Sequence, residues 1–197
     1  MLEIESHAWH FRCSHGNVLV AGLGMGMFLH AVAAKPDVER VVVIEIDPDV
    51  IELFKAATDF VKWPHRDKIV IVNLDALDGS AASTVSSAFH GRRPDYLYAD
   101  IWPDFPAEAA PSQTRAMCAL YRPVSAGWWG QEVEYGLWLD GDHRVASVED
   151  LEEFFQRHEI PAIVTGGYVG FCQAAVEAQL ATVALEPQRV QSLGMTA

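Results

Sequence analysis

The sequence has 197 residues, half of them apolar and 21% charged, which is the composition of a single globular domain with a sizeable core. Its formal net charge of −13 argues against nucleic acid as a partner, because an acidic surface repels a phosphate backbone. The three widely spaced cysteines do not indicate a disulfide framework or a metal site, and no apolar run approaches the roughly 20 residues of a membrane span.

Short β-branched runs alternate with longer helical patterns through the first part of the chain. In chain order they predict a strand at 17–21, a helix at 27–35, a strand at 40–46, a helix after Asp47, a strand at 68–74, a helix at 79–90, a strand at 95–101 and a helix at 107–121. The helix after Asp47 has the clearest start, because Asp47 can cap it and Pro48 fits its first position.

The second half of the chain is less regular. A fifth strand is expected within 124–139, ending near Gln131, and the segment 160–167 could form a sixth strand and its exit turn. Between them, Ser147 and Asp150 resemble a capping box that starts a helix, and the chain after residue 170 begins as a helix.

Continuously apolar strands that alternate with helices predict a parallel sheet covered on both faces. Because crossover connections are right-handed, the sheet should be doubly wound. The predicted fold class is therefore α/β, a Rossmann-like doubly wound and mainly parallel sheet in one domain over 1–197, with 1–15 as an N-terminal extension.

Three close glycines, Gly22, Gly24 and Gly26, join the first predicted strand to the first helix. Glycine permits positive φ angles, and it lets a backbone approach a ligand without a Cβ in the way. A dinucleotide-binding fingerprint would have its third glycine at position 27, where this chain has Met27. A Walker phosphate-binding loop is also absent, because no Gly-Lys-Ser/Thr follows the glycines. The loop alone could be no more than a tight strand-to-helix turn.

Acidic residues follow the next three predicted strands. Glu45 ends the second strand, where a carboxylate can accept both hydroxyls of a ribose. Asp75 follows the third strand and can accept a hydrogen bond from an exocyclic amine, although Asp75 or Asp78 could instead cap the next helix. Asp100 ends the fourth strand, at the crevice where ligands of such sheets bind.

The stretches VLVAGLGMG, VVVIEIDPDVIEL, NLDA and YADIW together resemble motifs of class I S-adenosylmethionine-dependent methyltransferases, and most closely those of the spermidine-synthase-like branch. The segment GWWGQE is similar to the end of the fifth strand in that group. The resemblance covers roughly residues 16–135. It implies S-adenosyl-L-methionine as cofactor, held by Gly22, Gly24, Gly26, Glu45, Ile46, Asp75, Ala76 and Asp100.

Catalysis by methyl transfer needs a base only where the acceptor must lose a proton, and the candidate catalytic residues are Asp100, Asp104 and Glu132. The candidate acceptor pocket consists of Trp102, Trp128, Trp129 and Gln131. We predict a methyltransferase acting on a small molecule, because Asp100 and Asp104 depart from the D-x-x-D spacing of aminopropyltransferases. Aminopropyl transfer of the polyamine type and a non-catalytic nucleoside-binding module remain alternatives.

The predicted setting follows from the same observations. The acidic, mixed N-terminus is unlike a signal peptide, so a cytoplasmic protein is expected. The expected partner is a small-molecule substrate, with no nucleic acid, membrane or bound metal, and a homodimer could complete the pocket.

Overall fold

The computed structural model describes residues 3–142 and 145–177. At its centre is a five-stranded sheet in the order β3-β2-β1-β4-β5. Every neighbouring pair of strands is parallel. The strands are β1 (Gly16–Ala21), β2 (Val38–Glu45), β3 (Ile69–Asn73), β4 (Tyr96–Ala99) and β5 (Ser125–Trp128).

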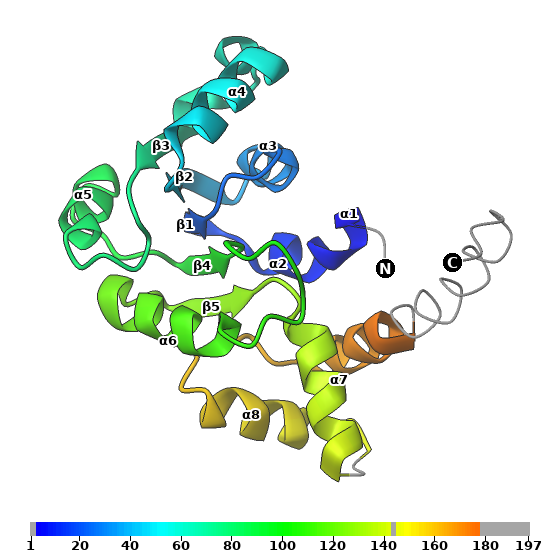
Figure 1. Ribbon diagram of the computed structural model, residues 1–197. Helices are drawn as coiled ribbons and strands as arrows, with labels where there is room; N and C mark the ends of the chain where they lie inside the picture. The colour runs from blue at the N-terminus through cyan, green and yellow to red at the C-terminus, as the bar shows by residue number, and fades with distance from the viewer. Residues whose placement is uncertain (1–2, 143–144, 178–197) are drawn as a thin grey trace, which may run out of the picture.

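Helices cover both faces of this sheet. They are α1 (Glu3–Ser6), α2 (Ala8–Cys13), α3 (Met27–Ala33), α4 (Pro48–Thr58), α5 (Ala81–Ala88), α6 (Ala110–Tyr121), α7 (Gln131–Asp142), α8 (Val148–Arg157), the 3-10 turns η1 (Phe60–Lys62) and η2 (Arg66–Lys68), and a helix over 166–177. Figure 1 shows α3 and α4 on one side of the sheet, with α5 and α6 on the other. The predicted Rossmann-like, doubly wound α/β fold is confirmed.

The central strands read as continuous apolar runs because both of their faces are buried. Val18 to Ala21 of β1 are at most 4% exposed, and Val41 to Ile44 of β2 at most 1%. The strand order reverses direction beside β1, since the chain runs outward through β2 and β3 and then returns to β4. In open sheets this switch point is where loops part at the carboxyl edge and leave room for a ligand.

Local signals account for several helix ends. The Asp47 side chain accepts a hydrogen bond from the backbone N–H of Asp49 at 2.8 Å, and Pro48 is the first residue of α4, as predicted. Ser147 is the N-cap of α8, as predicted, because its Oγ accepts from the backbone N–H of Asp150 at 3.0 Å and donates to Asp150 Oδ2 at 2.6 Å.

Two sequence predictions beyond β4 need correction. The fifth strand ends at Trp128, three residues earlier than expected, because the chain turns at Gly130 with φ of 87° and α7 begins at Gln131. No sixth strand forms at 160–167, where residues 161–165 are irregular and the last described helix starts at 166. Pro161 has no N–H to donate, and its carbonyl accepts from Ala126 of β5 at 2.9 Å.

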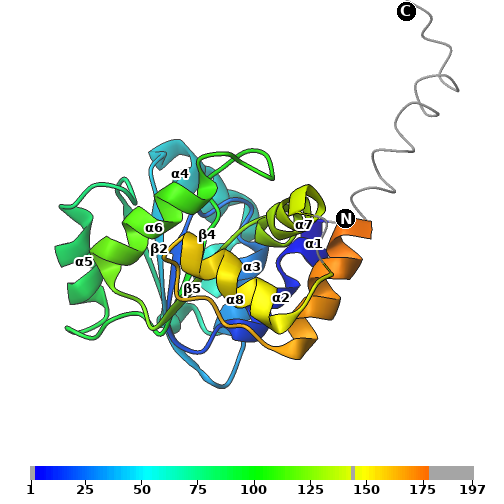
Figure 2. The same ribbon diagram turned by 90° about the horizontal axis from the view of Figure 1, so that it is seen from below.

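The two N-terminal helices and the last described helix group together at the β5 end of the molecule. Figure 2 shows α2, α7 and the orange helix 166–177 side by side. The ring of Trp9 in α2 stacks on Tyr168 of that last helix with centroids 4.2 Å apart. In the described part of the chain, no helix is long and apolar enough to cross a membrane.

Candidate functional site

The glycine loop between β1 and α3 passes very close to the end of β4. Gly22 has φ of 97°, and a Cβ at this position would lie 1.9 Å from the backbone oxygen of Asp100. Gly26, the N-cap of α3, lies against the Phe54 ring in the same way, whereas a Cβ on Gly24 would meet no atom within 4 Å. Gly22 and Gly26 are therefore required by packing, while Gly24 leaves the loop open toward the space in front of it.

That space is a cavity of about 640 Å³ at the carboxyl edge of the sheet. Its volume falls in the range of small-molecule and cofactor sites. The loops after β1, β2, β3 and β4 all contribute, and of the predicted site residues the cavity is lined by Gly22, Gly24, Glu45, Ile46, Asp75, Ala76, Asp100 and Trp102. Eight residues predicted from separate strand ends thus meet in one place.

Glu45 ties the end of β2 to the glycine loop. Its Oε2 accepts from the backbone N–H of Leu23 at 2.9 Å, and its Oε1 accepts from that of Asp47 at 3.0 Å. An ionised carboxylate offers about four lone-pair sites, so both oxygens keep capacity for hydroxyl donors from the cavity. The carboxylate is oriented by the backbone before any ligand arrives.

Asp75 and Asp78 were both candidates for contacting a ligand or for capping the next helix, and their positions differ. Asp75 Oδ1 accepts from the backbone N–H of Leu77 at 2.8 Å, and its exposed side chain lines the cavity. Asp78 Oδ1 accepts from the backbone N–H of Ser80 at 2.9 Å, just before α5, and this bond holds the pKa of Asp78 below its usual value. Asp78 serves the start of the helix, while Asp75 faces the cavity.

At the end of β4, Trp102 lines the cavity and donates from Nε1 to Gln113 Oε1 of α6 at 2.7 Å. Gln113 also lines the cavity, and no motif in the sequence pointed to it. Asp104 lies two residues beyond Trp102, is exposed and does not line this cavity. The structure therefore places Asp100, and not Asp104, at this cavity.

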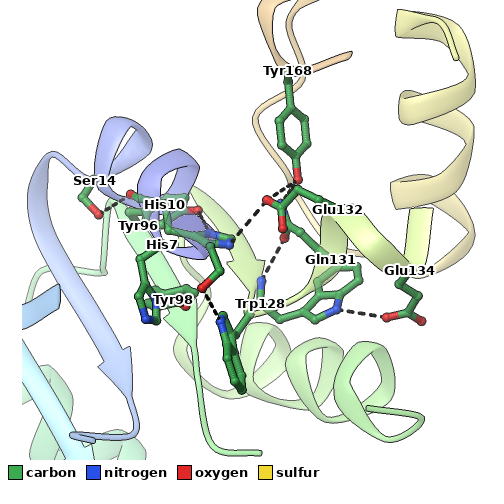
Figure 3. A network of polar contacts seen from close by, with 12 residues as sticks. His7, His10, Ser14, Tyr96, Tyr98, Trp128, Gln131, Glu132, Glu134 and Tyr168 are labelled. Carbon is green, nitrogen blue, oxygen red and sulfur yellow. Dashed lines mark hydrogen bonds and ion pairs between the residues drawn. The ribbon is translucent and has the colours of Figure 1, made fainter. Parts of the chain in front are cut away.

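Three other predicted residues, Trp128, Gln131 and Glu132, lie inside the protein rather than at the cavity, each at most 1% exposed. Trp128 donates from Nε1 to Glu134 at 3.1 Å, and Gln131 Oε1 accepts from the backbone N–H of Trp128 at 2.9 Å. These contacts belong to a buried polar network shown in Figure 3. Trp128 is the last residue of β5, whereas the turn at Gly130 places Gln131 and Glu132 at the start of α7, and none of the three lines the cavity.

The centre of this network joins α2, β4, α7 and the last described helix. His10 Nδ1 is hydrogen-bonded to Tyr96 Oη at 2.8 Å, and Tyr168 Oη donates to Glu132 Oε1 at 3.0 Å (Figure 3). His10 Nε2 has no hydrogen-bond partner and lies 3.8 Å from Glu132 Oε1. Gly127 makes this packing possible, because a Cβ there would lie 2.8 Å from the His10 ring.

Burial sets the charge states of His10 and Glu132. Desolvation lowers the pKa of His10 to about 3 and raises the pKa of Glu132 to about 7. His10 is therefore neutral at physiological pH, and its 3.8 Å approach to Glu132 is not an ion pair. The network is a set of hydrogen bonds between mostly neutral groups, which suits its position in the core.

Replacing Glu132 with glutamine should change how stability depends on pH. Since the folded-state pKa of Glu132 is raised to about 7, the native protein binds more protons than the unfolded chain between the usual glutamate pKa and about 7. Its contribution to stability therefore falls as pH rises through this window. The lowered pKa of His10 has the opposite effect, because its contribution to stability rises with pH below the usual histidine pKa. Only the difference between the parent protein and a Glu132 variant therefore isolates the contribution of Glu132.

We expect Glu132→Gln to gain stability relative to the parent protein between pH 5 and pH 8, in urea unfolding at both values. The amide oxygen can still accept from Tyr168, so packing is preserved. Glu52→Gln, at an exposed position of α4, is the matched control and should show no such gain. An equal response of the two variants would contradict the raised pKa.

Trp129 lies near the N-terminal helices. Its Nε1 donates to Ser6 Oγ at 2.8 Å, and its ring stacks on that of His7 with centroids 6.2 Å apart. His7 Nδ1 is hydrogen-bonded to Tyr98 Oη at 2.7 Å. A second cavity, of about 250 Å³ and mainly apolar, lies beside His7 and is also lined by Ala8, Phe11, Met27, Phe28 and Ala31. Met27 and Phe28 directly follow the glycine loop, so this cavity and the larger one flank that loop.

Sequence comparison assigns no family, since no family model and no curated protein matches the chain. Solved structures that resemble it include those of methyltransferases and spermidine synthases. One is the methyltransferase domain of bacterial CtHen1, with 13% identity over 62% of this chain and 60% of that one and a TM-score of 0.44. Another is spermidine synthase from Thermotoga maritima, with 18% identity over 60% of this chain and 38% of that one and a TM-score of 0.40. A third is the glycopeptide N-methyltransferase MtfA complexed with S-adenosyl-L-homocysteine, with 18% identity over 60% of this chain and 42% of that one and a TM-score of 0.41.

The matched part spans less than two thirds of each of these proteins. Likeness at this level defines no activity for the chain. Among the residues that the structure describes, no group of three or more His, Cys, Asp and Glu side chains could hold a metal ion.

Proposed function

We propose that the protein is an S-adenosyl-L-methionine-dependent methyltransferase that acts on a small-molecule acceptor. The observation that carries this proposal is the convergence of Gly22, Gly24, Glu45, Asp75 and Asp100 on one cavity at the switch point of the sheet. Each contributes the chemistry that one part of an adenosyl sulfonium requires. The resemblance of the four sequence motifs, which rests on the same residues, supports it independently of the comparisons with solved structures.

The residues fit the cofactor as follows. The Glu45 carboxylate, held by two backbone N–H groups, would accept the ribose hydroxyls. Asp75 would accept from the adenine amine, with Ile46 and Ala76 beside it. Asp100 and the backbone at Gly22 and Gly24 would face the methionine part, because they line the same end of the β1 and β4 loops.

A bound sulfonium supplies both the methyl group and its own leaving group, so the chain mainly positions the two reactants. Orientation of this kind supplies roughly 7–11 kcal/mol of barrier reduction. The apolar cavity beside His7 lies on the other side of the glycine loop and suits an acceptor with apolar surface. Asp100 remains the candidate base on the cofactor side, for acceptors that must lose a proton.

Thermal denaturation with a ligand panel tests the proposal. Ligands that bind only the native state raise its stability by about 2.7 kcal/mol at 100 times their Kd. We expect S-adenosyl-L-methionine and S-adenosylhomocysteine to raise the midpoint by about 5 °C or more, and NAD to have no effect. A larger shift with decarboxylated S-adenosylmethionine would favour aminopropyl transfer instead. No shift with any adenosyl compound would exclude both functions and a nucleoside-binding module as well.

A further inference from the structure

A second large cavity lies at the opposite, amino edge of the sheet, between α5 and α6. It has a volume of about 510 Å³. The chain enters β4 and β5 beside it, where the backbone N–H of Val124 donates to the carbonyl of Pro94 at 3.0 Å. Figure 1 shows α5 and α6 as neighbours on this face of the sheet. The cavity is lined by Ala82, Val85, Ser86, Gly91, Arg92, Arg93, Pro94, Leu120, Tyr121 and Arg122.

The arginines of this cavity differ from the rest. In residues 3–142 and 145–177, Arg93 and Arg122 are the arginines whose side chains make no hydrogen bond, ion pair or ring contact, and both line this one cavity. Each remaining arginine there has a partner: Arg12 the Trp9 ring, Arg40 the Ala88 carbonyl, Arg66 the Phe60 ring, Arg92 Glu39, Arg115 Glu159 and Arg157 Glu153.

Two unpaired guanidinium groups around one hollow are unexpected in a chain with a net charge of −13. Acidic side chains are abundant in the sequence, yet none in residues 3–142 and 145–177 forms an ion pair with Arg93 or Arg122. Arg92 adds a third guanidinium at the same cavity, fixed by Glu39 at 2.8 Å and by Asn17 at 3.1 Å. The cavity is therefore a positively charged hollow on an acidic protein.

The walls of this cavity are partly apolar, so a ligand that fills it must also have an apolar part. Val85 and Leu120 present aliphatic surface, and the Tyr121 ring is held in place because its hydroxyl donates to the Ala76 carbonyl at 2.7 Å. The hydroxyl of Ser86 and the guanidinium groups supply the polar part. Guanidinium matches phosphate and carboxylate because its planar fork of N–H donors can bind two oxygens at once.

We propose that this cavity binds a small molecule that carries a phosphate or carboxylate group on an apolar body, with Arg93 and Arg122 holding the anionic group. The site is separate from the cofactor cavity, which lies at the other edge of the sheet. It therefore stands or fails independently of the proposed methyl transfer.

An alternative role for Arg122 is local. It is the C-cap residue of α6, with φ of 51°, and a cation there also complements the negative end of a helix. That role does not explain Arg93, which lies in the loop after the α5 end and the turn at His90 and Gly91. The experiment must therefore test the two residues separately.

Isothermal titration of the full chain with phenyl phosphate and with benzoate, at constant ionic strength, tests the site. Benzyl alcohol serves as the neutral probe. We expect saturable binding of at least one anion and none of benzyl alcohol. Arg93→Gln and Arg122→Asn should each weaken that binding about tenfold, because each removes a charge-assisted contact. Asparagine is chosen at position 122 because it tolerates the left-handed backbone.

Arg66→Gln, which removes the same charge from a position outside the cavity, is the matched control and should leave the affinity unchanged. Equal weakening in this control would overturn the proposal, as would equal binding of benzyl alcohol or no saturable binding of either anion at millimolar concentration. Should Arg122→Asn disturb α6, Arg93→Gln decides alone, since the Arg93 side chain is exposed and makes no hydrogen bond, ion pair or ring contact with the described part of the chain.

Discussion

Replacing Glu45 with glutamine is expected to weaken S-adenosyl-L-methionine binding about 100-fold, which corresponds to about 2.7 kcal/mol. The proposed role of Glu45 is to accept both ribose hydroxyls with a charged carboxylate. An amide of the same size has one acceptor oxygen and no charge, so it cannot replace both charge-assisted bonds. Calorimetric titration of the folded variant measures the loss directly.

Glutamine is preferred to alanine because Glu45 also accepts from the backbone of Leu23 and Asp47. One amide oxygen preserves one of these bonds and limits the disturbance of the glycine loop. Glu52→Gln removes the same charge from the exposed face of α4 and should bind the ligand like the parent protein. An affinity of Glu45→Gln within about threefold of the parent would remove the ribose assignment.

Adding one methyl group at Gly22 is expected to be among the most destabilising single changes in the chain. The new Cβ would lie 1.9 Å from the backbone oxygen of Asp100, and φ at this position is 97°, so the β1 and β4 loops must separate. A backbone clash has no side chain that can move aside. We expect Gly22→Ala to cost about 4 kcal/mol or more in the free energy of unfolding.

Gly24→Ala is the matched comparison two residues away. It also has positive φ, at 49°, but its Cβ would meet no protein atom within 4 Å. The left-handed backbone alone should cost about 1–2 kcal/mol. Urea unfolding of both variants without ligand measures the difference. Equal destabilisation would show that backbone conformation, and not the contact with β4, makes Gly22 necessary.

The sheet could be predicted from the sequence because its strands carry a local signal. The segments VVVI in β2 and IVIV in β3 are apolar and β-branched, since Val41 to Ile44 are buried and Ile69 to Val72 are buried or half-buried. The cavity could be predicted for a related reason. In a parallel sheet, residues that end successive strands share one edge, so Gly22, Glu45, Asp75 and Asp100 meet without any long-range information.

The region after β5 could not be predicted in the same way. The segment GWWGQEVEYGLWL is rich in aromatic and apolar residues, which indicated a longer strand, but it turns at Gly130 and becomes α7. Its large side chains pack on α8 instead, as Tyr135 does on Phe154 with ring centroids 5.5 Å apart. Tertiary packing decides such segments, and local propensity does not reveal it.

The buried network was missed because it has no local signature at all. His10, Tyr96, Glu132 and Tyr168 come from four elements far apart in the chain. No spacing rule connects them, and an isolated histidine or glutamate in a sequence is usually solvated. The same holds for Arg93 and Arg122, whose common cavity depends on how α5 and α6 are arranged over the sheet.

The stacking of Trp9 on Tyr168 has a consequence for biosynthesis. A ribosome makes Trp9 and His10 long before it makes Tyr168 and its helix, so their aromatic and polar partners do not yet exist when they emerge. Contacts of such large sequence separation form late, because a long loop must close first. The nascent chain therefore carries Trp9 without its stacking partner until residue 168 has been made.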